Sequence, residues 1–140
     1  MCVLDSIPVL GTAIVNCPHW IWRLFYSIDY PVDNFVVFNN NGRGQITREL
    51  DLLGAAPHKY VKKVHVVHMP ANLGCSGAWN LIIKSFLKAP YWVISNHDVM
   101  YEPGFLQEMN EKAKDKDTGV VHGNNGGWDI FLLKDWMVKR

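Results

Sequence analysis

The stretch Tyr91–Phe105 reads YWVISNHDVMYEPGF and carries the clearest fold signal of this 140-residue chain. It opens with an apolar run, as expected of a strand that is buried on both faces of a parallel sheet. The run stops at the polar triplet Asn96–Asp98, and the dipeptide Pro103–Gly104 then precedes a new apolar pattern. A buried strand that ends in polar residues and leads into a helix predicts an α/β unit with a functional strand end.

Similar units precede and follow this stretch. We expect strands at Pro8–Val15, Phe35–Phe38, Val64–Val67, Tyr91–Ser95, Gly119–His122 and Ile130–Leu133. We expect helices after Pro18, over Gln45–Leu53, over Ala78–Leu87, from Pro103 and from Trp136, with Asn16 and Ser76 as caps of the first and third. This alternation predicts a single α/β domain over residues 1–140, with a Rossmann-like, mostly parallel sheet flanked by helices.

The composition excludes several classes of protein. With 49% hydrophobic residues the chain is globular, and 14 basic against 13 acidic residues, not massed in a block, argue against nucleic acid as a partner. Its three cysteines form no C-x-x-C pair, which fits a reducing compartment. The apolar run Ile7–Val15 is too short to span a bilayer and lacks the basic flank of a signal peptide. We therefore expect a cytoplasmic protein without a transmembrane segment.

Polar residues follow each of the first four strands, at Asn16, Asn39–Asn41, Asn72 and Asn96–Asp98. In open parallel sheets, ligands bind beyond these strand ends. One carboxylate, with water and phosphate oxygens, can hold Mg²⁺ or Mn²⁺, so Asp98 is the candidate metal ligand and His97 an additional one. A simple turn, with Asp98 as its cap and His97 packed on a neighbour, is the alternative for this triplet.

Three other segments each allow a functional and a structural interpretation. Asn72–Asn80 (NLGCSGAWN) can present free N–H groups to a phosphate or be an ordinary capped loop. Asn39–Gly44 (NNNGRG) can recognise a base or only turn the chain. Asn124–Gly127, followed by Trp128 and Asp129, suits a sugar-binding loop or a turn into a strand. His65 and His68 lie three apart on a strand and so face opposite sides, which argues against a metal pair.

In order, four motifs resemble the nucleotide-sugar-binding half of GT-A glycosyltransferases, in particular family 2. They are TAIVNCPHWIWRLFYSI, VVFNNNGRG, NLGCSGAWN and VISNHDVMYEPGFL, which together cover roughly 100 residues. The resemblance implies a floor under the nucleotide base, a loop that recognises this nucleotide base, a pocket for the donor and a D-x-D motif. The corresponding positions are Ala13, Ile14, Val15, Asn16, Asn39, Asn41, Asn72, Gly74, Asn80, Asn96 and His97, with Asp98 as the metal ligand.

The chain departs from the family pattern at several positions. Asn39 and Asn96 replace expected aspartates, and Trp79 stands where arginine is frequent. The loss of one charge at position 96 weakens the implied metal site or shifts work to His97. Family members continue into an acceptor-binding half that holds a catalytic base, whereas this sequence ends at Arg140, as a truncated or minimal form. Asp129 is the candidate base, with Asp135 as the weaker alternative.

The resemblance implies a metal-dependent glycosyltransferase that uses Mn²⁺ or Mg²⁺. Its donor would be a nucleoside-diphosphate sugar, which we expect to be UDP-linked. Its acceptor would be a hydroxyl group of a glycan or of another molecule, and the transfer would invert the configuration at the anomeric carbon. A sugar-1-phosphate nucleotidyltransferase would need a glycine-rich basic signature after the first strand, which NCPHWIW lacks. A binding module that has lost catalysis and a scaffold that binds no nucleotide are the alternatives from other classes.

Overall fold

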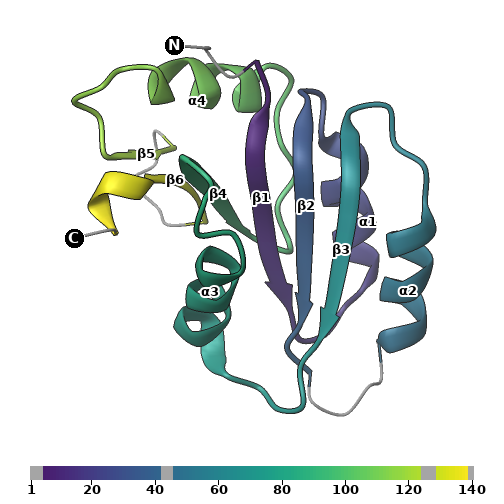
Figure 1. Ribbon diagram of the computed structural model, residues 1–140. Coiled ribbons are helices and arrows are strands. Elements are labelled where there is room, and N and C mark those ends of the chain that lie inside the picture. The colour runs from purple at the N-terminus through teal and green to yellow at the C-terminus, as the bar shows by residue number, and fades with distance from the viewer. Residues whose placement is uncertain (1–4, 42–45, 124–128, 139–140) are drawn as a thin grey trace.

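A computed structural model describes residues 5–41, 46–123 and 129–138 and places its strands in one sheet (Figure 1). The strands are β1 (Ile7–Ile14), β2 (Val32–Asn39), β3 (Val61–His68), β4 (Tyr91–Asn96), β5 (Val120–His122) and β6 (Ile130–Lys134). Their order is β3-β2-β1-β4-β6-β5. The first four strands are mutually parallel, and β6 runs antiparallel to both β4 and β5. The predicted α/β, mostly parallel sheet is confirmed.

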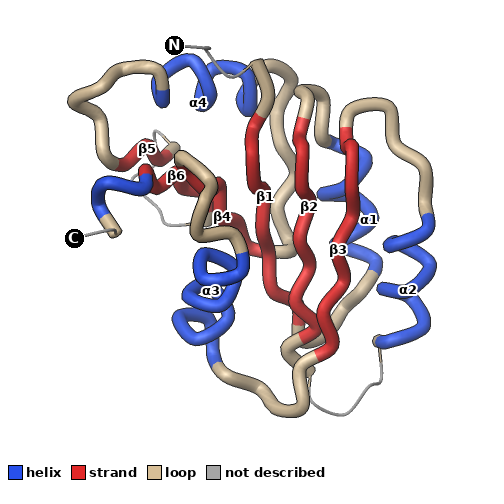
Figure 2. Tube along the Cα trace, viewed as in Figure 1, coloured by secondary structure: helices blue, strands red, loops and turns tan. Residues whose placement is uncertain are grey.

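Helices cover both faces of this sheet (Figures 1 and 2). The helices are α1 (His19–Ser27), α2 (Thr47–Ala55), α3 (Gly74–Ser85) and α4 (Phe105–Ala113), and a 3₁₀ turn follows at Asp135–Met137. Apolar residues of α1, α2 and α4 pack with β1 to β4 in one core, and those of α3 pack in a second core on the other face. Phe25, Leu106 and Leu10 are fully buried in the first core, and Ile82 and Trp92 in the second. The continuous apolar runs of the sequence therefore reflect burial on both faces.

Several predicted boundaries differ from the structure. Strands β2 and β3 are each longer than expected, because polar residues at their ends still pair in the ladder. The expected Ser76 cap is wrong: α3 already begins at Gly74, whose φ of 74° suits glycine, so Ser76 lies inside the helix. Asn16 is not the cap of α1 either, since Pro18 holds that position. Leu87, expected inside, is half exposed beyond the end of α3.

Two of the predicted helices also differ from the structure in their bounds or type. Helix α2 spans Thr47–Ala55 rather than Gln45–Leu53, and Gln45 lies outside the described residues. The helix expected from Trp136 is a short 3₁₀ turn that begins at Asp135.

The close packing of α3 on β1 leads to a stability prediction. A Cβ added at Gly11 would lie 2.6 Å from Cγ2 of Ile82, which is fully buried and so has little room to move. We expect Gly11→Ala to lower the free energy of unfolding by about 1–3 kcal/mol through overpacking. Urea denaturation of this variant, of Ile82→Ala and of the double variant measures the effect. Additive losses in the double variant would contradict the proposed clash, which requires coupling.

A neutral histidine between α1 and β3 leads to a prediction of pH dependence. His58 Nε2–H donates to the Phe25 carbonyl (2.8 Å), and its Nδ1 accepts from the Tyr60 N–H (3.0 Å). Burial lowers the pKa of His58 below 6.5, so below that pH the unfolded chain binds a proton that the folded chain does not. We therefore expect stability to fall as the pH drops from 6.5 toward the folded-state pKa. Urea midpoints across this range should depend less on pH in His58→Gln, and an unchanged slope would contradict the assignment.

Candidate functional site

The carboxyl ends of the parallel strands meet at one edge of the sheet, which is at the bottom of Figure 1 for β1, β2 and β3. The strand register brings predicted site residues together there. Ile14 pairs with Asn39, which in turn pairs with His68, and Ala13 pairs with Asn96. Strand β1 lies between β2 and β4. The chain adds β2 and β3 on one side of β1 and then crosses to add β4 on the other side, so the strand order reverses between β1 and β4. This is where open α/β sheets form their ligand crevice.

Asn40 joins the end of β2 to the start of α3, and the sequence analysis did not single it out. Its backbone N–H donates to the Ile14 carbonyl (2.8 Å). Its buried side chain donates to Asn72 Oδ1 (3.1 Å) and the Gly74 carbonyl (3.3 Å) and accepts from the Leu73 N–H (2.8 Å). One amide thus shapes the loop that contains two predicted donor-pocket residues. The run of three asparagines marked a polar strand end, but the contact of Asn40 with Asn72, 32 residues away, could not be predicted from it.

Asn39 is buried, and its amide is committed within the protein. Its Oδ1 accepts from the Asn41 N–H (3.1 Å), and its Nδ2 donates to His68 Nδ1 (3.0 Å). His68 then donates through Nε2 to Asp51 Oδ1 (2.8 Å), and Asn41 Nδ2 donates to the Val15 carbonyl (2.6 Å). These bonds hold the end of β2 in one shape. His65 bonds instead to Asn34 Oδ1 (2.9 Å), so the two histidines contact different partners.

A second cluster lies at the end of β4. The Asn96 N–H donates to the Asp129 carbonyl (2.8 Å), and its Nδ2 donates to Asp129 Oδ1 (2.9 Å). Two predicted site residues 33 positions apart are therefore in direct contact. Asp98 follows on an exposed turn, where it makes no hydrogen bond or ion pair with the described residues. Burial lowers the pKa of His97, Asp98 opposes this shift, and His19 adds to it, so the net effect favours the neutral imidazole.

These residues fit one kind of metal site. Within the described ranges no three His, Cys, Asp or Glu side chains converge as a metal-binding group. An all-protein cage therefore does not fit. An ion that is shared with a diphosphate needs only one or two carboxylates, because phosphate oxygens and water complete its shell. The exposed carboxylate of Asp98, with the ring of the adjacent His97, is the donor set that the described residues offer for such a shared ion.

The other predicted residues are spread along the same edge. Asn16, Val15 and Asn80 are exposed, whereas the Ile14 side chain is buried and only its carbonyl faces the loop. Trp79, at the position where the family often has arginine, packs edge-on against Phe131 at 5.4 Å in the second core. Trp128 and the loop Asn124–Gly127 lie outside the described residues.

Cys17 and Asp135 occupy two special positions. Cys17, next to Asn16, has a φ of 52°, an unusual backbone conformation for a non-glycine residue at the end of β1. The Asp135 N–H donates to the Pro90 carbonyl, at the amino end of β4. The alternative base therefore lies at the opposite end of β4 from Asn96, away from the other predicted site residues.

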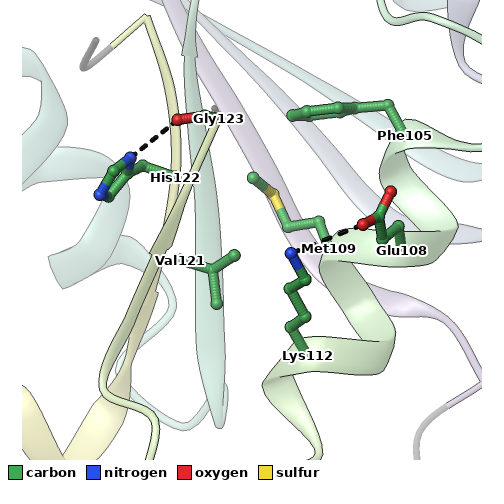
Figure 3. A pocket seen from close by; sticks show the side chains of 7 residues that line it. All are labelled: Phe105, Glu108, Met109, Lys112, Val121, His122 and Gly123. Atoms are coloured by element: carbon green, nitrogen blue, oxygen red, sulfur yellow. Dashed lines mark hydrogen bonds and ion pairs between the residues drawn. The ribbon is translucent and has the colours of Figure 1, made fainter. Parts of the chain in front are cut away.

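A small pocket lies between α4 and β5 (Figure 3). Phe105, Glu108, Met109 and Lys112 face it from the helix, and the end of β5 (Val121–Gly123) closes the other side. It encloses about 70 Å³, far below the roughly 300 Å³ at which pockets for drug-sized ligands begin. None of the sequence-predicted site residues lines it. A larger hollow of about 480 Å³ borders Pro8, Val9 and the end of α3, away from the strand carboxyl ends, so neither hollow coincides with the site.

Comparison with known proteins agrees with the fold and the motif order. The family model described as glycosyl transferase family 2 matches residues 14–140. In the described part of the chain, no helix has the length and apolarity needed to cross a membrane. The fold and the family match define a domain of the GT-A type from a glycosyltransferase family. The chain belongs to glycosyl transferase family 2.

Two similar proteins extend this result. A galactofuranosyl glycosyltransferase of Leishmania donovani is 31% identical over 108 residues, which cover 72% of this chain and 25% of the relative. The crystal structure of S. aureus TarS 1-349 superposes with a TM-score of 0.57 at 16% identity, covering 86% of this chain and 37% of that one. The second likeness shows the fold alone. The chain thus spans about a quarter of the length of the curated relative that it matches.

Proposed function

We propose that this protein transfers a sugar from a nucleoside-diphosphate sugar, UDP-linked, to an acceptor hydroxyl with inversion and with Mn²⁺ or Mg²⁺. The observation that carries the proposal is the convergence of Asn39–Asn41, Asn72 and Asn96–Asp98 at the strand edge where the fold binds ligands. Family membership supplies the reaction class. The free, exposed thiols of Cys17 and Cys75 favour a reducing compartment such as the cytoplasm.

In this proposal, different groups of residues contact different parts of the donor. Asn39–Asn41 at the end of β2, held by Asn40, would lie against the nucleotide, with Ala13 to Asn16 at the end of β1 as its floor. The Gly74 N–H itself donates to Asn72 Oδ1 (2.8 Å), so the N–H groups that follow it in the first turn of α3 would be the ones to face the diphosphate. Asp98 and His97 would hold the divalent ion, which supplies a counter-charge for the leaving diphosphate.

The acceptor hydroxyl is a weak nucleophile and needs a base to take its proton. Asp129 is the sequence-based candidate, and it lies beside Asn96 at the site edge. A galactofuranosyl donor is a candidate substrate because the Leishmania relative carries that name. Transfer of that sugar therefore belongs among the first reactions to assay.

Isothermal titration of UDP and of GDP, with and without Mn²⁺, tests the proposal. We expect UDP to bind only when Mn²⁺ is present, since the diphosphate needs a counter-charge at this edge. Turnover assays with UDP-sugars then follow, and transfer to an acceptor supports the enzyme. Failure of both nucleotides to bind under either condition would falsify the donor-site assignment.

A second candidate is a binding module that keeps the donor fold without catalysis. The asparagine at the first D-x-D position favours it, because one acidic group of the motif is absent there. UDP binding with Mn²⁺ but without transfer from any UDP-sugar offered is the result that it predicts.

A further inference from the structure

The contact between Asn96 and Asp129 offers a physical explanation for the altered D-x-D motif. Asn96 is the last residue of β4, and its neighbour Ser95 pairs with Ile130, the first residue of β6. Asp129 immediately precedes β6, so its position follows from the ladder. Backbone and side-chain hydrogen bonds of 2.8 and 2.9 Å then fix it against Asn96.

We propose that Asp129, directly before β6, supplies the negative charge that the first D-x-D position has lost, and that Asn96 is the residue that positions it. This inference rests on the proposed function, because it concerns the same metal and diphosphate site. It assigns to Asp129 a role in binding rather than the role of base.

The side-chain chemistry of the two residues is complementary. The Asn96 Nδ2 group is a donor, and Asp129 Oδ1 at 2.9 Å accepts from it. A carboxylate in place of the Asn96 amide would bring two acceptors of like charge to the same distance, without a proton between them. The asparagine at position 96 therefore suits a neighbouring aspartate, and together they keep one negative charge at this point of the edge.

Asp129 can still reach a ligand from this position. Its side chain is exposed, and Oδ2 has no hydrogen-bond partner among the described residues. Asp98 lies two residues beyond Asn96 on the exposed turn. Asp129 thus contacts Asn96 from the residue before β6, and Asp98 follows Asn96 on the turn after β4.

A charge exchange tests the proposal on the whole chain. Asp129→Asn removes the charge but leaves an amide oxygen to accept from Asn96, so the fold should persist. The double variant Asn96→Asp/Asp129→Asn restores the charge on β4 and reverses the direction of the hydrogen bond. Asp117→Asn, on the exposed turn after α4 at the opposite edge, is the matched charge control.

The readouts are the Kd of Mn²⁺ in the presence of UDP, by titration and by the Mn²⁺ electron paramagnetic resonance signal. We expect Asp129→Asn to weaken Mn²⁺ binding about 10- to 100-fold, the double variant to recover most of it, and the control to bind as wild type. Urea denaturation of each variant verifies that the fold is intact.

The remaining outcomes separate this inference from the proposed function. Unchanged Mn²⁺ affinity in Asp129→Asn would overturn the inference, and a simultaneous loss of transfer would identify Asp129 as the base instead. Weakened binding without recovery in the double variant also overturns it, because the charge is then not interchangeable between the strands. If wild type binds no Mn²⁺ with UDP, the proposed function itself fails.

Discussion

Asp98→Asn is expected to abolish the Mn²⁺-dependent binding of UDP and to slow sugar transfer by about 10²- to 10⁴-fold. The carboxylate lies on the exposed turn after β4 and is the metal ligand that we propose at the site edge. A metal at a leaving diphosphate contributes several kcal/mol to transition-state stabilisation, and each 1.36 kcal/mol corresponds to about tenfold in rate. Titration with UDP and Mn²⁺ measures the first effect, and initial rates of transfer measure the second.

The fold should not change in this variant, because Asp98 makes no hydrogen bond or ion pair with the described residues. Asp117→Asn again controls for the loss of one surface charge. Full transfer activity in Asp98→Asn would show that the metal, if one is used, is held elsewhere.

Asn40→Asp is expected to have the largest effect on stability among polar substitutions at this edge, about 3 kcal/mol or more. The Asn40 Nδ2 group donates to two oxygens, Asn72 Oδ1 and the Gly74 carbonyl, within a buried setting. A carboxylate there loses both bonds, faces two acceptors and carries a buried charge. The start of α3 should shift, so the affinity for UDP should also fall.

Urea denaturation and nucleotide titration of this variant give the two results. Asn80→Asp is the matched control for stability, because it makes the same chemical change at an exposed position of α3. Its free energy of unfolding should stay within about 0.5 kcal/mol of wild type. Equal stability losses in the two variants would contradict a special role for the buried amide.

Most of the element order could be predicted from the sequence, because buried parallel strands leave long apolar runs. Strand ends and helix starts were harder to predict. Polar residues such as His68 still pair in the ladder, and the positive φ of Gly74 starts α3 two residues before Ser76. Local propensity shows neither, because partners distant in the sequence determine both.

Those parts of the site that lie at the end of a single strand could be predicted from the sequence. The parallel register alone brings Asn39 and Asn96 to the same edge, on either side of β1. The contact of Asn96 with Asp129 was not predictable, because the antiparallel insertion of β6 between β4 and β5 leaves no mark in the sequence. The role of Asn40 likewise depends on its distance from Asn72 in space, which the sequence pattern does not contain.

The central place of β1 has a consequence for the order in which the chain can fold during synthesis. Strands β1, β2 and β3 are complete at His68, but β1 pairs on its other side with β4, where Leu10 meets Val93. A growing chain therefore carries a three-stranded sheet with an open inner edge until Asn96 has left the ribosome, and such an edge promotes aggregation. Asn39–Asn41, which we propose to face the nucleotide, can reach their position in that intermediate, whereas Asp98 reaches the edge only when β4 docks. Nascent chains that stop before β4 would thus lack the proposed metal-binding part of the site.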